Sequence, residues 1–321
     1  MKKKIIIIAG DPRSINSEII FKCWKKLSNN IKKNIYLIAN FKLIKEQFKL
    51  LNYKINPVIV KDIFKSDNSN KLKVINIKLN FKKPFKIEKK DSSKYVLESL
   101  HLGHNLALNK NIAGIINCPI DKRLIIRKNI GVTELLASKC KIKKDSEVMV
   151  IKNEKLIVSP LTTHIDIKNV TKKLSRNLII SKIETINKWY LKLYQKKPKI
   201  GILGLNPHNA ELKTNSEEKK IIIPAINKLR KKNFFLKGPL VSDTVFIKDY
   251  KNFDIIIGMY HDQILTPFKT LYKFKAINLT LGLKYVRVSP DHGVAVDKIL
   301  KKKSNPESLL ECIKYINKLN K

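Results

Sequence analysis

Three of the six histidines in the chain come directly after short apolar runs, at His164, His208 and His261. In an open parallel sheet, ligands bind outside the carboxyl ends of the strands, so three such histidines could converge. Neutral imidazoles suit Zn²⁺, Co²⁺ or a similar ion, and three protein ligands leave a position open for substrate. The separations of 44 and 53 residues form no local motif, however. A histidine after a strand is more often a capping or hydrogen-bonding residue, so both interpretations stand at this point.

Other polar residues interrupt apolar or helical segments. Arg287 lies within the apolar run 285–288. A buried strand rarely carries an unpaired charge, so Arg287 either pairs with an acidic residue or meets an anionic ligand. Thr133 begins a helical stretch, where threonine is usually a cap and sometimes a phosphate ligand. Lys269 and Asn278 are also polar residues amid apolar segments.

Two loops have compositions that suit ligand contact. The turn from Gly10 to Glu18 joins an expected strand to a helix and could present backbone N–H groups to an anion, or be an ordinary turn. It contains no G-x-G-x-x-G pattern, and the chain has no Walker A motif. The loop Ser289–Gly293 contains His292 and Gly293, which could approach a cofactor or simply form a turn.

The elements that must position these residues alternate between short apolar runs and longer amphipathic segments. Strands are expected at 5–9, 35–39, 58–60, 74–77, 112–116, 148–151, 156–158, 199–203, 254–258, 276–279 and 285–288. Helices are expected at 16–27, 41–51, 94–109, 167–194 with a break, 216–231, and after Asn305-Pro306. Continuously apolar strands alternating with helices predict an α/β protein with a parallel sheet covered on both faces. The basic segment 81–93 is the best candidate for an exposed loop.

The composition narrows the class of protein. Lys and Arg number 67 and Asp and Glu 26, which gives a formal charge of +41 over 321 residues. Such a charge attracts polyanions, and a nucleic-acid-binding protein is one interpretation. The lysines are spread along the whole chain rather than clustered, so we expect a solvated surface and no specific nucleic-acid partner.

Cysteine usage and hydropathy indicate the compartment. The four cysteines, Cys23, Cys118, Cys140 and Cys312, are far apart and form no C-x-x-C pair, which favours reduced thiols. The apolar run 5–9 is too short for a signal peptide, and no run approaches a membrane span. We therefore expect a soluble, cytoplasmic protein with no membrane partner.

Taken together, an ordered set of segments resembles the 4-hydroxythreonine-4-phosphate dehydrogenase family. The set covers essentially the whole chain and consists of 10–20, Asn117–Lys122, Gly131–Glu134, Leu161–His164, Gly204–His208, Gly238–Thr244, Met259–Gln263, Asn278–Gly282 and Asp291–Gly293. No single segment is decisive, but their order is highly specific.

The resemblance implies a fold and a set of roles. It implies two α/β/α domains around a central cleft, like isocitrate and isopropylmalate dehydrogenases, with 1–128 plus 290–321 as the first and 129–289 as the second. It also implies a homodimer whose metal site takes ligands from both subunits. His164, His208 and His261 match the family's metal ligands. The family's substrate-binding positions are matched by Val132, Thr133, Lys269, Asn278 and Arg287.

The implied reaction is the NAD(P)-dependent oxidation of a small phosphorylated substrate, 4-phosphohydroxy-L-threonine, in pyridoxal phosphate (vitamin B6) biosynthesis. The resulting keto acid loses CO₂ to give 3-amino-2-oxopropyl phosphate. A divalent ion (zinc, magnesium or cobalt) would lower the pKa of the substrate hydroxyl. His292 and Gly293 are the expected cofactor contacts. Asp243 and Asp262 are the candidate catalytic residues, and each could instead orient a histidine.

The sequence departs from the family pattern in three places. Val132 replaces the usual histidine of the segment Gly-His-Thr-Glu, which removes a polar substrate contact. Arg13, Asn16 and Ser17 stand where the family typically has Ala, Gly and Pro, and the stretch after Gly293 lacks the usual small residues. The valine motivates an alternative, a paralogous metal-dependent dehydrogenase that acts on a different hydroxy acid.

Overall fold

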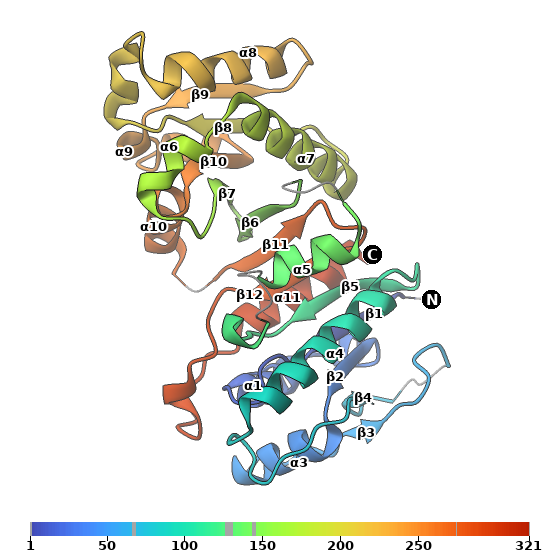
Figure 1. Ribbon diagram of the computed structural model, residues 1–321. Helices are drawn as coiled ribbons and strands as arrows, with labels where there is room; N and C mark the ends of the chain where they lie inside the picture. Colours follow the sequence, from blue (N-terminus) through green and yellow to red (C-terminus); the bar gives the residue numbers. More distant parts are fainter. Residues whose placement is uncertain (1, 66–68, 126–130, 143–145, 274, 321) are drawn as a thin grey trace. The chain divides into compact units, whose positions relative to one another are not determined.

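The computed structural model describes residues 2–65, 69–125, 131–142, 146–273 and 275–320. Contacts divide the chain into two compact units (Figure 1). The first unit contains Met1–Cys140 and Leu283–Lys321, and the second contains Lys141–Gly282. The boundary expected after residue 128 falls within 126–130, outside the described residues. By contacts, α5 (Val132–Lys139) and β12 (Arg287–Pro290) belong to the first unit, whereas the sequence-based division assigned α5 and most of β12 to the second domain.

The first unit is built on a parallel sheet with the strand order β3-β4-β2-β1-β5-β12. The strands are β1 (Lys4–Ile8), β2 (Ile35–Ala39), β3 (Val58–Ile59), β4 (Lys73–Asn76), β5 (Ile112–Asn117) and β12. The isoleucines of β1 are at most 3% exposed because helices cover both faces. This matches the fully apolar run from which the strand was predicted.

Helices cover the two faces of this first sheet. They are α1 (Asn16–Lys26), α2 (Asn29–Lys32), α3 (Phe41–Leu50), α4 (Lys89–Ala107), α5 and α11 (Glu307–Leu319). Gly103 of α4 lies against Ile8, and an added Cβ there would come within 2.5 Å of the Ile8 side chain. On the opposite face, Ile316 of α11 lies beside Gly114 of β5. Side chains alternate between faces along β1 and β5, so Ile8 and Gly114 mark the two layers.

The second unit has a mixed sheet with the order β11-β6-β7-β10-β8-β9. Its strands are β6 (Val148–Lys152), β7 (Ile157–Thr162), β8 (Ile200–Leu203), β9 (Leu236–Leu240), β10 (Ile255–Tyr260) and β11 (Ile277–Leu281). The expectation of a purely parallel sheet is wrong here, because β6 runs antiparallel to both β7 and β11. A tight turn joins β6 to β7, and the Asn153 side chain accepts the backbone N–H groups of Lys155 and Leu156 within it. So short a connection can only join antiparallel strands.

The second unit also contains α-helices, not all of which were expected. They are α6 (Val170–Lys173), α7 (Arg176–Tyr194), α8 (Ile223–Arg230), α9 (Ser242–Val245) and α10 (His261–Tyr272). Helix α10 was not expected, since Pro267 lies inside it. In the first unit, the segment 81–93 was expected as a loop, but α4 already begins at Lys89. Its first turn is too polar to show a helical apolar period.

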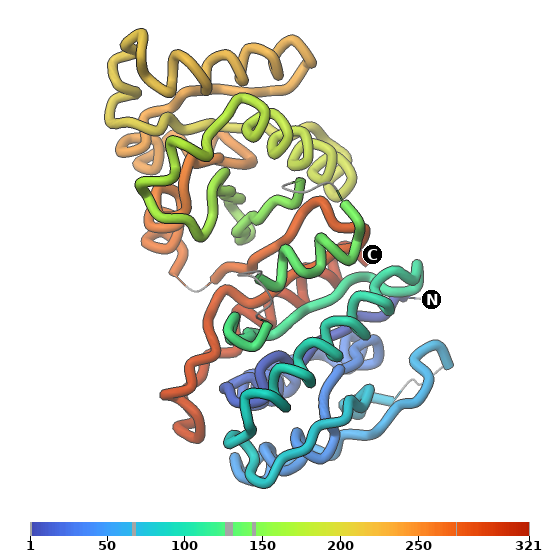
Figure 2. Tube along the Cα trace, in the orientation of Figure 1, coloured from blue at the N-terminus to red at the C-terminus, as the bar shows by residue number. Residues whose placement is uncertain are grey.

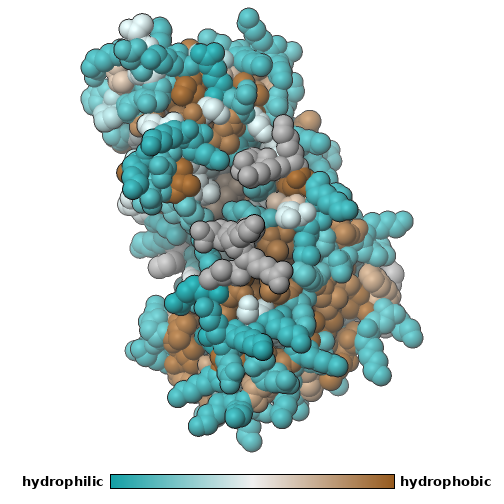
Figure 3. All heavy atoms as spheres, in the orientation of Figure 1, coloured by the Kyte–Doolittle hydropathy of each residue, from teal (hydrophilic) through white to brown (hydrophobic). Residues whose placement is uncertain are grey.

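The two ends of the chain lie side by side in the first unit, as Figure 2 shows. Lys3 N donates to Asn320 Oδ1 at 3.1 Å, and Asn320 Nδ2 donates to Lys3 O at 2.7 Å. Hydrophilic side chains cover most of the face seen in Figure 3. Among the described residues, no helix combines the length and apolar character needed to cross a membrane.

Candidate functional site

Arg287 is the centre of a buried polar cluster in the first unit. It lies on β12 opposite Ile115 of β5, and Asn117 comes two residues later on the same face of β5. Arg287 Nε donates to Asn117 Oδ1 at 2.6 Å, and Nη1 donates to Thr133 Oγ1 at 3.3 Å. We call Arg287, Asn117 and Thr133 the arginine cluster. The structure thus brings together two of the predicted substrate-binding residues, Arg287 and Thr133.

Burial tunes the charge of this cluster. Arg287 is only 3% exposed. Burial lowers its pKa to about 10, while interactions with Tyr285, Cys312 and Glu134 oppose that shift. The guanidinium therefore remains charged at neutral pH. Val132 and Thr133 lie in the first turn of α5, and both are half-buried.

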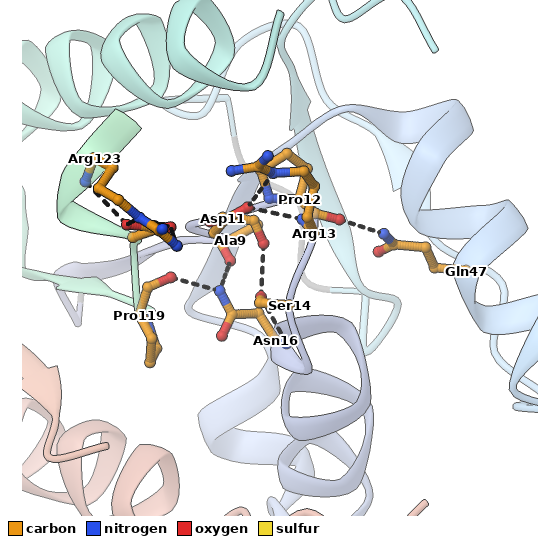
Figure 4. Close-up of polar contacts among 10 residues, drawn as sticks. Ala9, Asp11, Pro12, Arg13, Ser14, Asn16, Gln47, Pro119 and Arg123 are labelled. Atoms are coloured by element: carbon orange, nitrogen blue, oxygen red, sulfur yellow. Dashed lines mark hydrogen bonds and ion pairs between the residues drawn. The ribbon is translucent and has the colours of Figure 1, made fainter. Parts of the chain in front are cut away.

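The turn from Gly10 to Asn16 is a rigid βα connection (Figure 4). Gly10 has φ of +77°, and an added Cβ would lie 2.5 Å from Pro119 O. Asn16 Nδ2 donates to Ala9 O and to Pro119 O, both at 2.8 Å. The carboxylate of Asp11 accepts Arg13 N at 2.8 Å and pairs with Arg13 Nε at 3.5 Å.

The backbone N–H groups of this turn are already engaged inside the protein. Asp11 N donates to Pro119 O at 3.0 Å, Ile15 N donates to Val294 O at 3.3 Å, and Asn16 N donates to Ser14 Oγ at 3.1 Å. This favours an ordinary βα turn over a cradle of free N–H groups for an anion. Burial raises the pKa of Asp11, and the hydrogen bond from Arg13 opposes that rise.

His292 and Gly293, the predicted cofactor contacts, lie in the loop that meets this turn through Val294. His292 Nδ1 lies 3.0 Å from Gly293 O. Burial lowers the pKa of His292, so the imidazole is neutral at physiological pH. A neutral ring that donates from Nδ1 leaves Nε2 as an acceptor, and Nε2 is buried without a hydrogen-bond partner among the residues that the structure describes.

The three predicted metal-binding histidines all follow carboxyl ends of neighbouring parallel strands in the second unit. His164 comes two residues after β7, His261 directly after β10, and His208 five residues after β8. Since β10 pairs in parallel with both β7 and β8, these ends lie at one edge of the sheet. We call these three residues the histidine edge.

Within the histidine edge, two rings lie together. The ring centroids of His164 and His261 are 5.6 Å apart. Thr162 Oγ1 donates to Met259 O at 2.7 Å and ties the ends of β7 and β10 together. His261 Nδ1 lies 2.7 Å from Asp262 Oδ1, and a carboxylate only accepts, so Nδ1 carries a proton. In the neutral ring this leaves the lone pair on Nε2.

His208 is held differently. It is exposed and begins five consecutive residues, through Leu212, whose φ values lie between +45° and +57°. None of the five is a glycine, and L-residues disfavour this left-handed region. Within the described ranges, no three His, Cys, Asp or Glu side chains are placed to hold a metal ion. The metal-ligand role of the three histidines stays a prediction.

The remaining predicted site residues are spread over the second unit. Asp262 is exposed in the first turn of α10, and Asp243 is exposed in the first turn of α9. Lys269 is exposed on α10. Asn278 lies half-buried on β11, and its Oδ1 is buried without a hydrogen-bond partner among the described residues. Their catalytic and substrate-binding roles also stay predictions.

Two polar residues that the sequence did not single out organise these elements. Gln263 Nε2 donates to Gly204 O at 2.7 Å and to Ser242 Oγ at 2.8 Å, and its Oε1 accepts Met259 N at 2.6 Å. It therefore joins the start of α10 to the end of β8 and the start of α9. Asn117 is the other, and the signal for it was a polar residue that ends a wholly apolar strand.

Glu218 is a third organising residue. It is fully buried, and its Oε1 accepts the backbone N–H groups of Leu205 and Asn206, both at 2.8 Å. Burial would raise its pKa, but these hydrogen bonds and the one from the Asn206 side chain outweigh burial and hold the pKa below its ordinary value. Glu218 thus fixes the loop that leads to His208.

Comparisons with known proteins agree along the whole chain. A family model described as "Pyridoxal phosphate biosynthetic protein PdxA" matches residues 31–316. The 4-hydroxythreonine-4-phosphate dehydrogenase of Sulfurihydrogenibium sp. is 36% identical over 316 residues, which cover 97% of this chain and 96% of the relative. The enzyme of the same name from Aquifex aeolicus is 37% identical over 324 residues, 99% of each chain. The crystal structure of the Klebsiella pneumoniae enzyme matches with a TM-score of 0.88 at 26% identity, covering 99% of this chain and 100% of that one.

Proposed function

The chain belongs to the PdxA family of pyridoxal phosphate biosynthetic proteins, the 4-hydroxythreonine-4-phosphate dehydrogenases, and from that premise we propose how its residues divide the reaction. The reaction is the NAD(P)-dependent oxidation of 4-phosphohydroxy-L-threonine, followed by loss of CO₂ to give 3-amino-2-oxopropyl phosphate. The observation that carries the assignment is the full-length match to relatives of this one activity.

The arginine cluster holds an anionic end of the substrate. A buried guanidinium with a planar fork of donors binds phosphate or carboxylate with charge-assisted hydrogen bonds, and Thr133 adds a hydroxyl at the start of α5. Lys269 supplies a second cation and Asn278 an amide whose buried oxygen is ready to accept a hydrogen bond. These roles follow the family positions, and the buried cluster supports the first of them.

The histidine edge fits a divalent metal ion. Its donor set is imidazole nitrogen, and Asp262 holds the Nε2 lone pair of His261 ready for a ligand bond. A divalent ion held there would polarise the substrate hydroxyl and stabilise negative charge on its oxygen. Zinc, cobalt and magnesium are the candidates, and imidazole favours the first two. His208 is exposed on its own loop, which fits a homodimer in which metal ligands come from both subunits.

Proton transfer and cofactor binding complete the proposal. Because Asp262 already bonds His261, we assign it the role of orienting that ring and leave Asp243 as the candidate base for the hydroxyl proton. NAD(P)⁺, when bound, accepts the hydride. His292 and Gly293 lie in the loop that meets the Gly10–Asn16 turn, and we propose that this loop contacts the cofactor.

One assay tests the proposal as a whole. The wild-type chain should produce NADH or NADPH from 4-phosphohydroxy-L-threonine, and a chelator should abolish the signal until a divalent metal is restored. His164→Ala, His208→Ala and His261→Ala should each lose turnover and metal content while the melting temperature stays unchanged, since none of the three is in the core. Full activity of the metal-free protein or of any single variant would exclude the metal assignment.

Val132 favours one alternative, a paralogous dehydrogenase for a different hydroxy acid. Val132 is half-buried beside Thr133, and valine cannot donate the hydrogen bond that the usual histidine would. Such a bond to a charged group is worth roughly 1.5–3 kcal/mol. If another donor compensates, Val132→His changes KM only modestly. If the natural substrate differs, the wild type is poor and Val132→His raises kcat/KM by about tenfold or more.

The proposal also covers the charged surface of the protein and its location in the cell. We propose that the charge of +41 reflects solvated lysines, with no specific nucleic-acid partner. Duplex DNA affinity should then be non-specific and nearly gone at high salt. The four cysteines are buried as free thiols, which fits a cytoplasmic location.

A further inference from the structure

Asn117 is placed to control both the direction and the charge of Arg287. It is 3% exposed at the carboxyl end of β5, and its Oδ1 accepts a short hydrogen bond, 2.6 Å long, from the charged Nε–H of Arg287. The two residues are 170 positions apart in sequence, so the contact depends on the pairing of β5 with β12.

The acceptor on Asn117 is an amide and therefore carries no charge. It satisfies the Nε–H of a buried guanidinium and fixes the plane of the guanidinium group without neutralising it. A carboxylate at the same place would make an equally good hydrogen bond, but it would cancel the field that draws an anion to the arginine. Thr133 Oγ1, at 3.3 Å from Nη1, is also a neutral acceptor.

We propose that Asn117 is a positioning residue for substrate binding, which orients Arg287 through a neutral acceptor and so adds no negative charge beside the guanidinium that binds an anionic group of the substrate. The identity of that substrate rests on the proposed function. The positioning role of Asn117 requires only that Arg287 binds an anion at the carboxyl end of β5.

The decisive variant is Asn117→Asp, which keeps the shape and the acceptor but adds a negative charge. We expect KM for 4-phosphohydroxy-L-threonine to rise by about tenfold or more, with kcat changed by less than about threefold, because the loss is in binding an anion. The melting temperature should not fall, since the hydrogen bond to Arg287 is retained as an ion pair. If Asn117 had only a structural role, Asn117→Asp would bind the substrate with the KM of the wild type.

Two further variants complete the set. Asn117→Ala removes the acceptor, so KM should rise and the melting temperature should fall. Asn109→Asp is the matched control. Asn109 precedes the opposite end of β5 and is exposed, and among the described residues its Oδ1 accepts only Asn111 N, at 2.8 Å. It adds the same charge without touching Arg287, and KM should stay at the wild-type value.

A calorimetric titration of the holoenzyme with inorganic phosphate separates this proposal from the proposed function. Phosphate should bind the wild type and Asn109→Asp alike, and Asn117→Asp about tenfold more weakly. Equal phosphate affinity and equal KM in Asn117→Asp and Asn109→Asp would overturn the role of Asn117. A wild type that binds phosphate more tightly than Asn117→Asp but never reduces NAD(P)⁺ with this substrate would instead overturn the proposed function and leave the positioning role standing.

Discussion

The arginine cluster and the histidine edge are organised in opposite ways. The arginine cluster is buried, and each of its three side chains is hydrogen-bonded to another member of the cluster. The histidine edge is open to solvent, with His164 and His208 exposed and only His164 and His261 in ring contact. One region is complete within a single unit of one chain, and the other presents its groups outward.

The difference indicates which binding step each region is built for. A buried cation that is already oriented loses little freedom when an anion arrives, so its affinity comes from preorganisation. Imidazoles carried by three separate segments at an open edge gain their order when a metal ion or a partner subunit binds them. Variants in the two regions should therefore fail in different ways.

The largest effect is expected at Arg287. Arg287→Met should lower kcat/KM by about a hundredfold or more, because it removes the buried charge that we propose binds the substrate. Metal content should stay at the wild-type level. Arg287→Lys keeps the charge but not the planar fork of donors, so its kcat/KM should lie between those of the wild type and Arg287→Met. Steady-state kinetics and metal analysis of both variants measure this, and loss of metal in Arg287→Met would break the separation of the two regions.

The next effect is expected at Glu218, which holds the loop before His208. Glu218→Gln should lower the free energy of unfolding by roughly 2 kcal/mol at neutral pH, since it weakens charge-assisted bonds to two buried N–H groups. The neighbouring Glu217 accepts a hydrogen bond from the Asn206 side chain at 2.8 Å and no buried backbone N–H among the described residues, so Glu217→Gln should change stability by less than about 0.5 kcal/mol. Denaturant unfolding of both variants provides the comparison.

The pH dependence of Glu218 has a defined sign. Its pKa is held below the ordinary value of 4.5 in the folded chain. A carboxylate of this kind stabilises the fold fully above its unfolded pKa, and the contribution disappears as the pH falls through the folded pKa. The stability gap between wild type and Glu218→Gln should thus be constant above about pH 5 and close below 4.5. A gap that persists unchanged in acid would show that the charge of Glu218 is not the cause.

The smallest effect is expected in the left-handed segment after His208. Ala210 has φ of +50°, a conformation that glycine adopts without penalty. Ala210→Gly should raise the free energy of unfolding by about 0.5 kcal/mol, after allowing for the greater freedom of glycine in the unfolded chain. The same change at Ala225, in the right-handed helix α8, should be destabilising by about 1 kcal/mol or more. Destabilisation by both would mean that the segment is not strained in solution.

Much of the fold could be predicted because a run of consecutive apolar residues is enough to identify a buried strand. The four isoleucines of β1 and all five residues of β2 are buried, and no charged residue interrupts either run. The direction of β6 could not be predicted in this way, since it depends on the turn at Asn153 and not on the composition of the strand. Helix α10 was missed because Pro267 argues locally against a helix, and packing of Ile264 and Phe268 in the core overrides it.

The candidate site shows the same limit at the level of side chains. The histidines could be named from sequence because each follows a strand, and the strand order that aligns β7, β10 and β8 then sets them at one edge. The contact of Asn117 with Arg287 depends on the register of β5 with β12, which no local pattern encodes. Glu218 is a similar case, because the two N–H groups that it accepts lie twelve and thirteen residues earlier.

The discontinuity of the first unit has a consequence for synthesis on the ribosome. The second unit is one continuous segment, Lys141–Gly282, whereas the first unit needs Leu283–Lys321 to supply β12 and α11. Domains fold as units as the chain emerges. The second unit can therefore complete its sheet before β12, the last strand of the first unit, has been synthesised. Arg287 lies in that last segment, and a nascent chain therefore acquires this proposed anion-binding residue only after the whole second unit has been made.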